Sequence, residues 1–273
     1  MVKTAFSTLG CPEWTWENIL AAARELGYDG ISLRGLGAVL DDMSQAEPFR
    51  AERIKATKAE LSRQGLEICS LDTSVSFDKP EKFTETLAAG RACLDLAGAL
   101  GIGRIRVFGN SLLAGEQMEQ GAARVASGLR SLAAHAEDRG VDILLETHGD
   151  FLRGRDLRSI MEQVDHPKVG VLWDLHHPYR LAGERMEETY RELKPYIKAV
   201  HLKDSQGNRD AFNYCLFGRG DVPWRDGLRL LKTDGYSGWL ILEWEKRWHL
   251  ELEPPEAVFP HFIMELRRAW EEI

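Results

Sequence analysis

Short runs of β-branched and other apolar residues alternate along the chain with longer stretches in which apolar residues recur every three or four positions. The first pattern predicts buried β-strands, and the second predicts amphipathic helices. Their regular alternation is typical of β–α–β units that build a parallel sheet. Eight strands are predicted, at residues 3–9, 30–34, 66–73, 104–110, 141–148, 169–177, 197–204 and 238–244.

The stretches between these runs predict one helix for each strand. Long helices are expected at residues 16–26, 49–64, 83–100 and 117–139, and shorter ones at 157–164, 186–193, 224–231 and 255–270. A glycine that suits a left-handed C-cap follows each long helix: Gly27, Gly65, Gly101 and Gly140. The repeating unit is therefore a helix, a glycine stop and a buried strand.

Eight β–α units can close into a barrel or form an open doubly wound sheet. Neither a G-x-G-x-x-G fingerprint nor a P-loop follows the first strand, which favours the barrel. The length of 273 residues suits such a barrel, and no low-complexity linker interrupts the series. We therefore predict a single (β/α)₈ TIM-barrel domain over residues 1–273, with functional groups at the carboxyl ends of its strands.

The charge balance and the cysteines narrow the environment and the partners. Asp and Glu total 43 against 35 Lys and Arg, and the net charge of −8 opposes binding to nucleic acid or to anionic lipid. A small-molecule partner is favoured, and homo-oligomerisation stays open. Neither a signal-peptide pattern nor an apolar run of membrane-spanning length is present. The cysteines form no CxxC pair, which predicts reduced thiols and a cytoplasmic protein: Cys11, Cys69, Cys93 and Cys215.

The last four predicted strands each carry an ionisable residue close to the carboxyl end. They read VDILLETHG, VGVLWDLHHP, IKAVHLKDS and GWLILEWEK, and the residues are Glu146, Asp174, His201 and Glu243. Three carboxylates converging with an imidazole would repel one another unless a cation neutralised them. One divalent metal ion is therefore expected, with Mn²⁺ favoured and Mg²⁺, Co²⁺ or Zn²⁺ as alternatives. Alternatively, each residue is an isolated polar group that is solvated or paired with a lysine or arginine.

Four motifs resemble one known superfamily: ETHG at residues 146–149, WDLHH at 173–177, HLKD at 201–204 and GYSGWLILEWEK at 235–246. They are similar to the xylose-isomerase-like barrels of sugar phosphate isomerases and epimerases, over nearly the whole chain. The resemblance implies a metal bound by the same four residues at the strand ends. It also implies that His177 lies beside the metal and touches substrate while His176 points elsewhere. Alternatively, His177 merely ends its strand before Pro178.

Two arginines and a tryptophan are candidate substrate contacts near other strand ends. Arg34 in GISLRG and Arg106 in RIRVFGN could hold a carboxylate, a phosphate or sugar hydroxyls. For Arg34, solvation at the surface or pairing with an acidic neighbour is an equal alternative. Trp14 follows the first strand and could stack on a sugar ring, although most tryptophans are core residues.

Strand alternation adds two further candidates. Lys203 lies two residues after His201, so both side chains should face the same side, where a lysine could stabilise a developing enolate oxygen. A structural ion pair of Lys203 with Glu243 or Asp204 is an equal alternative. His148 stands in the same relation to the glutamate of ETHG and is expected to contact substrate or the metal ligands.

These residues indicate proton-transfer chemistry on a carbohydrate. A metal that chelates a carbonyl and an adjacent hydroxyl would acidify a neighbouring carbon. Glu146 and Glu243 could then remove a proton and return one through an enediolate, which predicts an isomerase or epimerase of a sugar, keto-sugar or sugar phosphate. If a leaving group lies beta to that carbon, the same intermediate predicts a dehydratase or lyase of a keto-sugar or inosose. A binding subunit without catalysis is the non-enzymatic alternative.

Two departures from family patterns limit the assignment. Ketose 3-epimerases carry another glutamate about one turn beyond the strand-five ligand, whereas the corresponding region here reads GDFLRG, with Leu152 in place of an acid. The related endonuclease IV needs further histidines for three zinc ions, but this chain offers Arg34, Asp72 and Asn110. The DNA-repair function is therefore disfavoured. The substrate, its phosphorylation and the native metal stay open.

Overall fold

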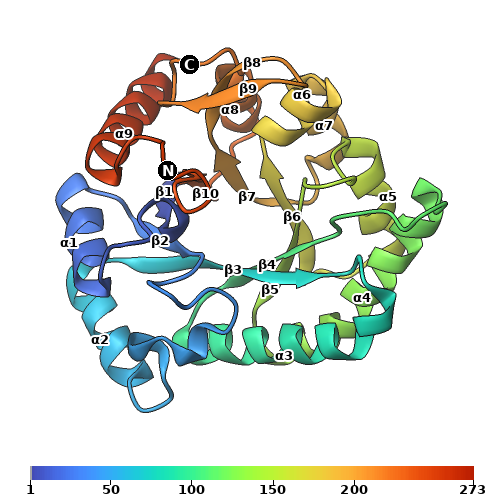
Figure 1. Cartoon of the computed structure of the whole chain (residues 1–273), viewed down its shortest axis with the longest axis horizontal. Helices are drawn as coiled ribbons and strands as arrows, with labels where there is room; N and C mark the ends of the chain where they lie inside the picture. The colour runs from blue at the N-terminus through green and yellow to red at the C-terminus, as the bar shows by residue number, and fades with distance from the viewer. Residues whose placement is uncertain (1) are drawn as a thin grey trace. The chain divides into compact units, whose positions relative to one another are not determined.

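Eight parallel strands form a closed barrel within residues 2–273, which the computed structural model describes (Figure 1). Met1, the first residue of the expected domain, lies outside the described residues. The strands are β1 (Lys3–Ser7), β2 (Gly30–Leu33), β3 (Glu67–Ser76), β4 (Arg104–Phe108), β5 (Asp142–Glu146), β6 (Val169–Asp174), β7 (Ile197–Leu202) and β10 (Trp239–Leu242). Their order is β1-β10-β7-β6-β5-β4-β3-β2, so the predicted TIM barrel is confirmed.

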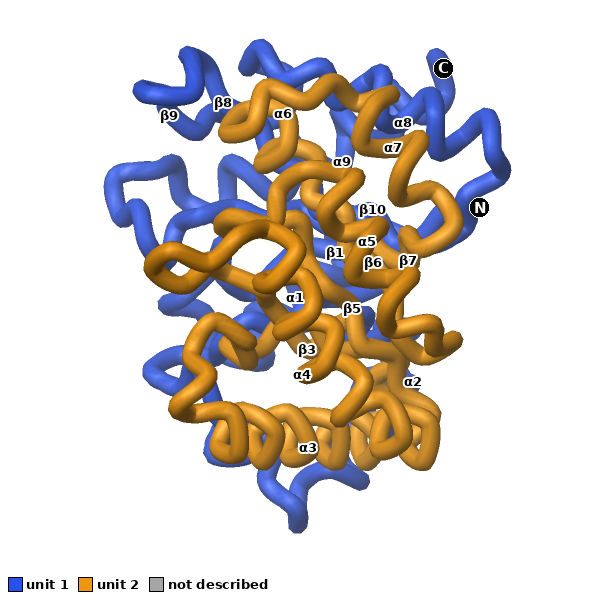
Figure 2. The backbone as a smooth tube through the Cα atoms, turned by 90° about the vertical axis from the view of Figure 1, so that its right-hand side faces the viewer, with its two compact units in different colours: residues 1–69, 200–273 blue, residues 70–199 orange. Residues whose placement is uncertain are grey.

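The described residues form two compact units, which Figure 2 distinguishes by colour. One comprises the residues up to Cys69 together with Val200–Ile273, and the other comprises Ser70–Ala199. We call them the first and the second unit. That residues 1–273 fold as one domain stays a prediction.

In the first unit, β1 pairs in parallel with β2 and with β10. Its helices are α1 (Trp16–Leu26), α2 (Ile54–Gln64), α8 (Trp224–Thr233), α9 (Pro255–Glu272) and the 3₁₀ turns η1 (Thr8–Gly10), η2 (Met43–Gln45) and η3 (Glu47–Phe49). Phe6 of β1 stacks on Phe259 of α9 with ring centroids 4.2 Å apart, and Tyr28 meets Phe6 edge-on. These aromatic contacts bury α9 against the strands.

In the second unit, β5 pairs in parallel with β4 and with β6. Its helices are α3 (Phe83–Leu100), α4 (Met118–Arg139), α5 (Gly154–Val164), α6 (His176–Ala182), α7 (Met186–Leu193) and the 3₁₀ turn η4 (Pro80–Lys82). Ile143, Leu144 and Leu145 follow one another in β5 and are all fully buried. Such an uninterrupted apolar run is typical of a parallel strand that is covered on both faces.

Several predicted boundaries are wrong for local reasons. The helix predicted at residues 49–64 begins only at Ile54, because the preceding segment contains Pro48 and forms the turn η3. The strand predicted to reach residue 177 ends at Asp174, and α6 begins two residues later. The sequence pattern also missed an antiparallel hairpin formed by β8 (Asp204–Gly207) and β9 (Phe212–Cys215).

Two features bear on the predicted environment of the protein: the state of the cysteines and the hydropathy of the helices. All four cysteines are free thiols, as predicted. Among the helices of residues 2–273, none combines the length and the hydropathy that crossing a membrane requires. The cytoplasmic location stays a prediction.

Candidate active site

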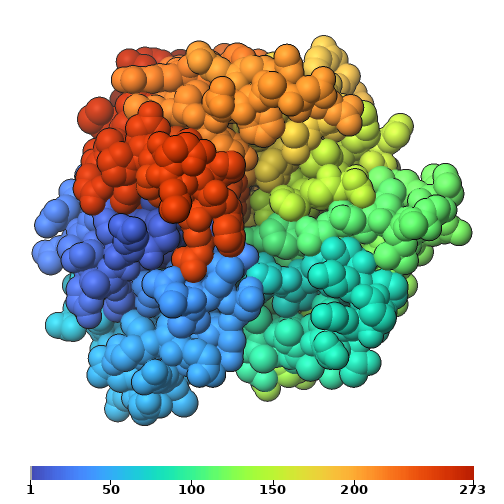
Figure 3. Space-filling model, viewed as in Figure 1, coloured from blue at the N-terminus to red at the C-terminus, as the bar shows by residue number. Residues whose placement is uncertain are grey.

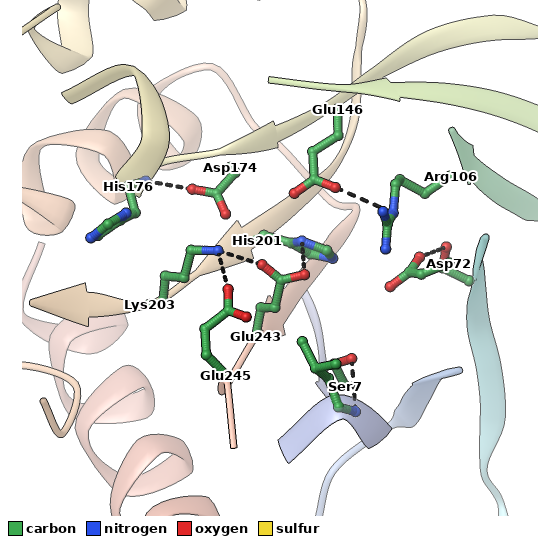
Figure 4. Close-up of polar contacts among 12 residues, drawn as sticks. Ser7, Asp72, Arg106, Glu146, Asp174, His176, His201, Lys203, Glu243 and Glu245 are labelled. Atoms are coloured by element: carbon green, nitrogen blue, oxygen red, sulfur yellow. Dashed lines mark hydrogen bonds and ion pairs between the residues drawn. The ribbon is translucent and has the colours of Figure 1, made fainter. Parts of the chain in front are cut away.

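Glu146 ends β5 and is buried beside an arginine of the neighbouring strand. The Nε atom of Arg106 lies 3.2 Å from Oε2 of Glu146, and Figure 4 shows the two side chains pointing toward each other. The guanidinium carbon of Arg106 lies 3.9 Å from the ring centroid of Phe108. Nη1 of Arg106 is buried and has no hydrogen-bond partner within residues 2–273. The pair therefore retains one buried donor that a substrate oxygen could accept from.

Asp174 ends β6 and lies at the start of α6. Its Oδ1 accepts the backbone N–H of His176 at 2.7 Å and that of His177 at 3.0 Å. This carboxylate therefore satisfies two amides at a helix N-terminus, where a negative charge is favoured. Asp174, His176 and His177 offer ligand atoms within 4.8 Å of one another. His176, which was expected to point elsewhere, is therefore also near Asp174.

Two imidazole rings follow the ends of β5 and β6. Nδ1 of His177 lies 3.0 Å from the carbonyl oxygen of Thr147, and Nδ1 of His148 lies 3.1 Å from Oδ1 of Asn110. The centroids of the two rings are 5.1 Å apart, and the rings pack edge-on. The alternation argument for His148 is wrong, because β5 ends two residues earlier and His148 lies in a turn bridged to Phe151.

In the first unit, a lysine lies between two glutamates (Figure 4). Nζ of Lys203 is 2.5 Å from Oε2 of Glu243 and 2.8 Å from Oε1 of Glu245. Nδ1 of His201 lies 3.3 Å from the other carboxylate oxygen of Glu243. His201, Lys203 and Glu243 are all buried. The alternative of a structural ion pair between Lys203 and Glu243 is therefore confirmed.

Sequence reasoning missed Glu245 and the role of Asn110. Glu245 lies two residues after Glu243, the same spacing that singled out Lys203, although β10 itself ends at Leu242. Asn110 adopts φ = 53°, a left-handed conformation that the apolar pattern of β4 does not reveal. The only available signal was the residue type, because asparagine tolerates positive φ better than most residues.

Asp204 is a buried carboxylate that organises the loop after the hairpin. Its oxygens accept the backbone N–H groups of Ser205 at 2.8 Å and of Gly218 and Gly220 at 2.9 Å each. Burial raises the pKa of the Asp204 carboxyl, and these backbone donors partly oppose that rise. Asp204 therefore anchors the loop, as its hydrogen bonds show.

Arg34 and Trp14 have partners within the first unit. Arg34 is buried and Nη1 donates to the carbonyl of Leu40 at 3.2 Å, so the alternative of surface solvation is wrong. Nε1 of Trp14 donates to Glu256 at 3.1 Å, and the indole lines a hollow of about 310 Å³ together with Leu250. Trp14 therefore borders a surface hollow.

The charged segment after β10 is anchored on the first unit. The backbone N–H of Arg247 donates to the carbonyl of Leu9 at 3.1 Å, and its guanidinium donates to the carbonyl of Gly37 at 3.0 Å. Figure 3 shows the segment around residue 250 in red, beside the blue N-terminal residues. These two hydrogen bonds hold the segment against the residues that follow β1 and β2.

Comparisons with known proteins support the same assignment as the motifs. A fructoselysine 3-epimerase of Escherichia coli O157:H7 is 24% identical over 256 residues, which cover 89% of this chain and 90% of that protein. An inosose dehydratase of Klebsiella pneumoniae subsp. pneumoniae is 30% identical over 142 residues, covering 45% of this chain and 47% of that protein. The crystal structure of the IOLI protein with a binding zinc atom has a TM-score of 0.83 at 16% identity and covers 99% of both chains.

The family profile gives the broadest match. It describes the xylose isomerase-like TIM barrel and matches residues 20–267. This range contains all four motifs that carried the resemblance. The chain therefore belongs to the xylose isomerase-like TIM barrel family.

Proposed function

We propose that the chain is a divalent-metal-dependent epimerase or isomerase of a sugar, keto-sugar or sugar phosphate. The observation that carries the proposal is a set of buried ligand groups at or just beyond the ends of strands that are consecutive in the barrel, β5, β6, β7 and β10. The proposed metal ligands are Glu146, Asp174, His201 and Glu243. Their depth agrees with the rule that TIM-barrel chemistry occurs at the carboxyl ends of the strands.

The charges of these residues fit a divalent cation. Buried carboxylates need a counter-charge or must take up protons. Arg106 and Lys203 each pair with one proposed ligand, Glu146 and Glu243 respectively, and Asp174 accepts backbone N–H groups and lies 3.7 Å from Nδ1 of His177. Three carboxylates with one imidazole suit Mn²⁺ best, with Mg²⁺, Co²⁺ or Zn²⁺ as alternatives.

A bound divalent ion would supply Lewis acidity at a substrate carbonyl and the adjacent hydroxyl. Glu146 and Glu243 would act as the proton acceptor and donor on the carbon beside that carbonyl. Epimerisation removes the C–H proton to one carboxylate, forms an enediolate, and returns a proton from the other carboxylate. Lys203 contacts Oε2 of Glu243, and the ion or the proton would be taken at Oε1, which lies 3.3 Å from Nδ1 of the proposed ligand His201.

Other side chains would orient the carbohydrate. The buried Nη1 of Arg106 would donate to a substrate oxygen, and His177 and His148 would accept from its hydroxyl groups. Substrate contacts by Lys203, Trp14 and Arg34 stay predictions. A small carbohydrate substrate without nucleic acid or membrane binding completes the proposal, and homo-oligomerisation stays open.

A dehydratase of a keto-sugar or inosose is the second candidate. The match to an inosose dehydratase favours it, and so does Leu152, which stands where ketose 3-epimerases carry a further glutamate. In this reaction the enediolate would expel a β-hydroxyl group as water after the same proton abstraction. The two candidates therefore share their first step and differ only in the fate of the intermediate.

Solvent exchange in heavy water tests the proposal. Mn²⁺-reconstituted protein is incubated with a panel of keto-sugars, inososes and sugar phosphates, and the products are examined by NMR and mass spectrometry. An epimerase or isomerase should introduce deuterium at the carbon alpha to the carbonyl. A dehydratase should release water together with the hydrogen of that carbon. The Glu243→Gln variant should lower turnover by roughly 10² to 10⁴, the contribution of a positioned acid–base group.

The metal content of each variant must be measured in parallel, because Glu243 is proposed both to bind the ion and to transfer a proton. Glu162→Gln, in the exposed ion pair with Arg158, is the matched control and should retain full turnover. Conversion with complete retention of the alpha hydrogen would instead indicate an intramolecular hydride shift. A protein that binds no divalent ion would overturn the metal assignment.

A further inference from the structure

Asn110 occupies an unusual backbone position directly after β4. Within residues 2–273, Asn110 and Asp165 are the non-glycine residues with positive φ. A left-handed conformation is unfavourable for most L-residues, and asparagine is among the few that tolerate it. The carbonyl of Asn110 accepts the N–H of Asp150 at 2.7 Å, and a Cβ atom on Gly149 would overlap that carbonyl. The loops after β4 and β5 are therefore fitted closely to each other.

This backbone position directs the Asn110 side chain at an imidazole. Its Oδ1 lies 3.1 Å from Nδ1 of His148, and an amide oxygen can only accept a hydrogen bond. Nδ1 of His148 must therefore carry the hydrogen, which makes Nε2 the acceptor of the neutral ring. The centroid of the His148 ring also lies 4.5 Å from that of the Phe108 ring. This packing restricts the rotation of the imidazole.

His177 shows the same arrangement with a backbone acceptor. Its Nδ1 lies 3.0 Å from the carbonyl oxygen of Thr147, so His177 also carries its hydrogen on Nδ1 and accepts through Nε2. The His148 and His177 rings pack edge-on with centroids 5.1 Å apart, so two such acceptors belong to adjacent rings. Neighbouring acceptors of this kind suit a ligand that carries several hydroxyl groups.

We propose that Asn110 is a positioning residue that holds His148 in the Nδ1–H tautomer, so that Nε2 accepts a hydrogen bond from a hydroxyl-bearing substrate. The inference rests on the proposed function for its substrate and on the two loops for its geometry. The left-handed backbone of Asn110 then has a physical reason, because it aims the amide at the ring.

The tautomer is measured directly by ¹⁵N NMR. Protein labelled at the histidine rings is loaded with diamagnetic Mg²⁺ and studied at about pH 8.5, where a histidine with the ordinary pKa of about 6.5 is neutral. A His148→Gln variant assigns the His148 signals. The wild type should show a protonated Nδ1 and an unprotonated Nε2 at His148. An Nε2–H tautomer would overturn the proposal.

Two variants separate positioning from loop structure. Asn110→Gly keeps the left-handed backbone but removes the amide, so His148 should lose its preference for the Nδ1–H form. Asp150→Asn weakens the hydrogen bond to the N–H of Leu112 in the same loop and should leave the tautomer unchanged. His177 is the internal reference, because its backbone acceptor is present in every variant. An unchanged His148 tautomer in Asn110→Gly would also overturn the proposal.

Kinetics supply a second, independent readout. With a substrate from the panel above, Asn110→Gly should lower kcat by about tenfold to a hundredfold, as expected for losing one oriented hydrogen bond, at unchanged metal content. Turnover at the wild-type level would show that the tautomer does not matter for catalysis. If the panel gives no turnover, the proposed function fails, whereas the NMR result still decides the role of Asn110.

Discussion

Lys203 carries an ammonium group that is almost fully withdrawn from water, with 1% of the residue exposed. Burying such an ion costs several kcal/mol, which the two carboxylates of Glu243 and Glu245 offset at 2.5 and 2.8 Å. Lys198 of β7, the strand that ends just before Lys203, forms an ion pair with Asp142 at 3.1 Å, but 29% of its side chain is exposed. Water screens that second pair, so the two lysines should differ in their contribution to stability.

Replacing the two lysines tests this difference. Lys203→Met should lower the free energy of unfolding by about 3–5 kcal/mol, because it leaves two carboxylates without their buried counter-charge. Lys198→Met should change it by no more than about 1 kcal/mol, as is usual for exposed pairs. Urea denaturation of the metal-free proteins provides the measurement. Equal effects of the two substitutions would contradict the role of burial.

The position of a residue can be predicted from the sequence where strand periodicity reaches it. Glu146 and Asp174 end apolar strands, so their places at the ends of β5 and β6 follow from the pattern. The contact between Asn110 and His148 could not be predicted in this way. It depends on a positive φ at Asn110 and on the turn after β5 that contains His148. Periodicity carries no information on the conformation of such turns.

Among the elements, α4 packs against the loop that follows β3 through a helical glycine. A Cβ atom at Gly128 would overlap the ring of Phe77, which is buried. Gly98 in α3 has a more open setting, because its nearest neighbour would be Cβ of Arg139 at 3.3 Å. Glycine is unfavourable in helices, so its presence at residue 128 reflects the space that Phe77 takes.

The two glycines should respond differently to alanine. Gly128→Ala should destabilise the protein by about 1–3 kcal/mol, because overpacking outweighs the gain in helix propensity. Gly98→Ala should cost less than Gly128→Ala, because its closest contact, with Cβ of Arg139, is 3.3 Å and the gain in helix propensity offsets that crowding. Thermal and urea unfolding measure both. A stabilising Gly128→Ala would show that Phe77 moves aside at little cost.

The elements themselves were predictable because parallel strands are buried on both faces and read as apolar runs. Their ends were less predictable. Asp174 caps α6 with its carboxylate, so the chain turns into a helix where the apolar pattern still suggested strand. The β8–β9 hairpin was missed because its residues are largely polar, and its position depends on the hydrogen bonds that Asp204 accepts.

At the scale of the whole molecule, the proposed ion would bind side chains that are far apart in the sequence. Its proposed ligands extend from Glu146 to Glu243. An ion that binds only the folded chain stabilises it by mass action, by about 2.7 kcal/mol at a free concentration one hundred times Kd. For a chain of this length each kcal/mol corresponds to about 2–4 °C in Tm.

Chelation of the ion should therefore lower Tm by about 5–10 °C, measured by calorimetry with and without excess divalent ion. His201→Ala and Asp174→Asn should each abolish this metal-dependent shift while leaving the circular dichroism spectrum nearly unchanged, because groups at the strand ends lie outside the apolar layers of the barrel.

Hydrogen exchange makes the test sharper. If one ion binds all four proposed ligands, His201→Ala should reduce the metal-dependent protection of amides in β5 and β6 as well as in β7. His135→Ala, on the surface of α4, is the control and should retain the full shift. Loss of protection confined to β7, the strand that carries the substitution, would indicate separate ions or none, and the four-ligand assignment would then be wrong.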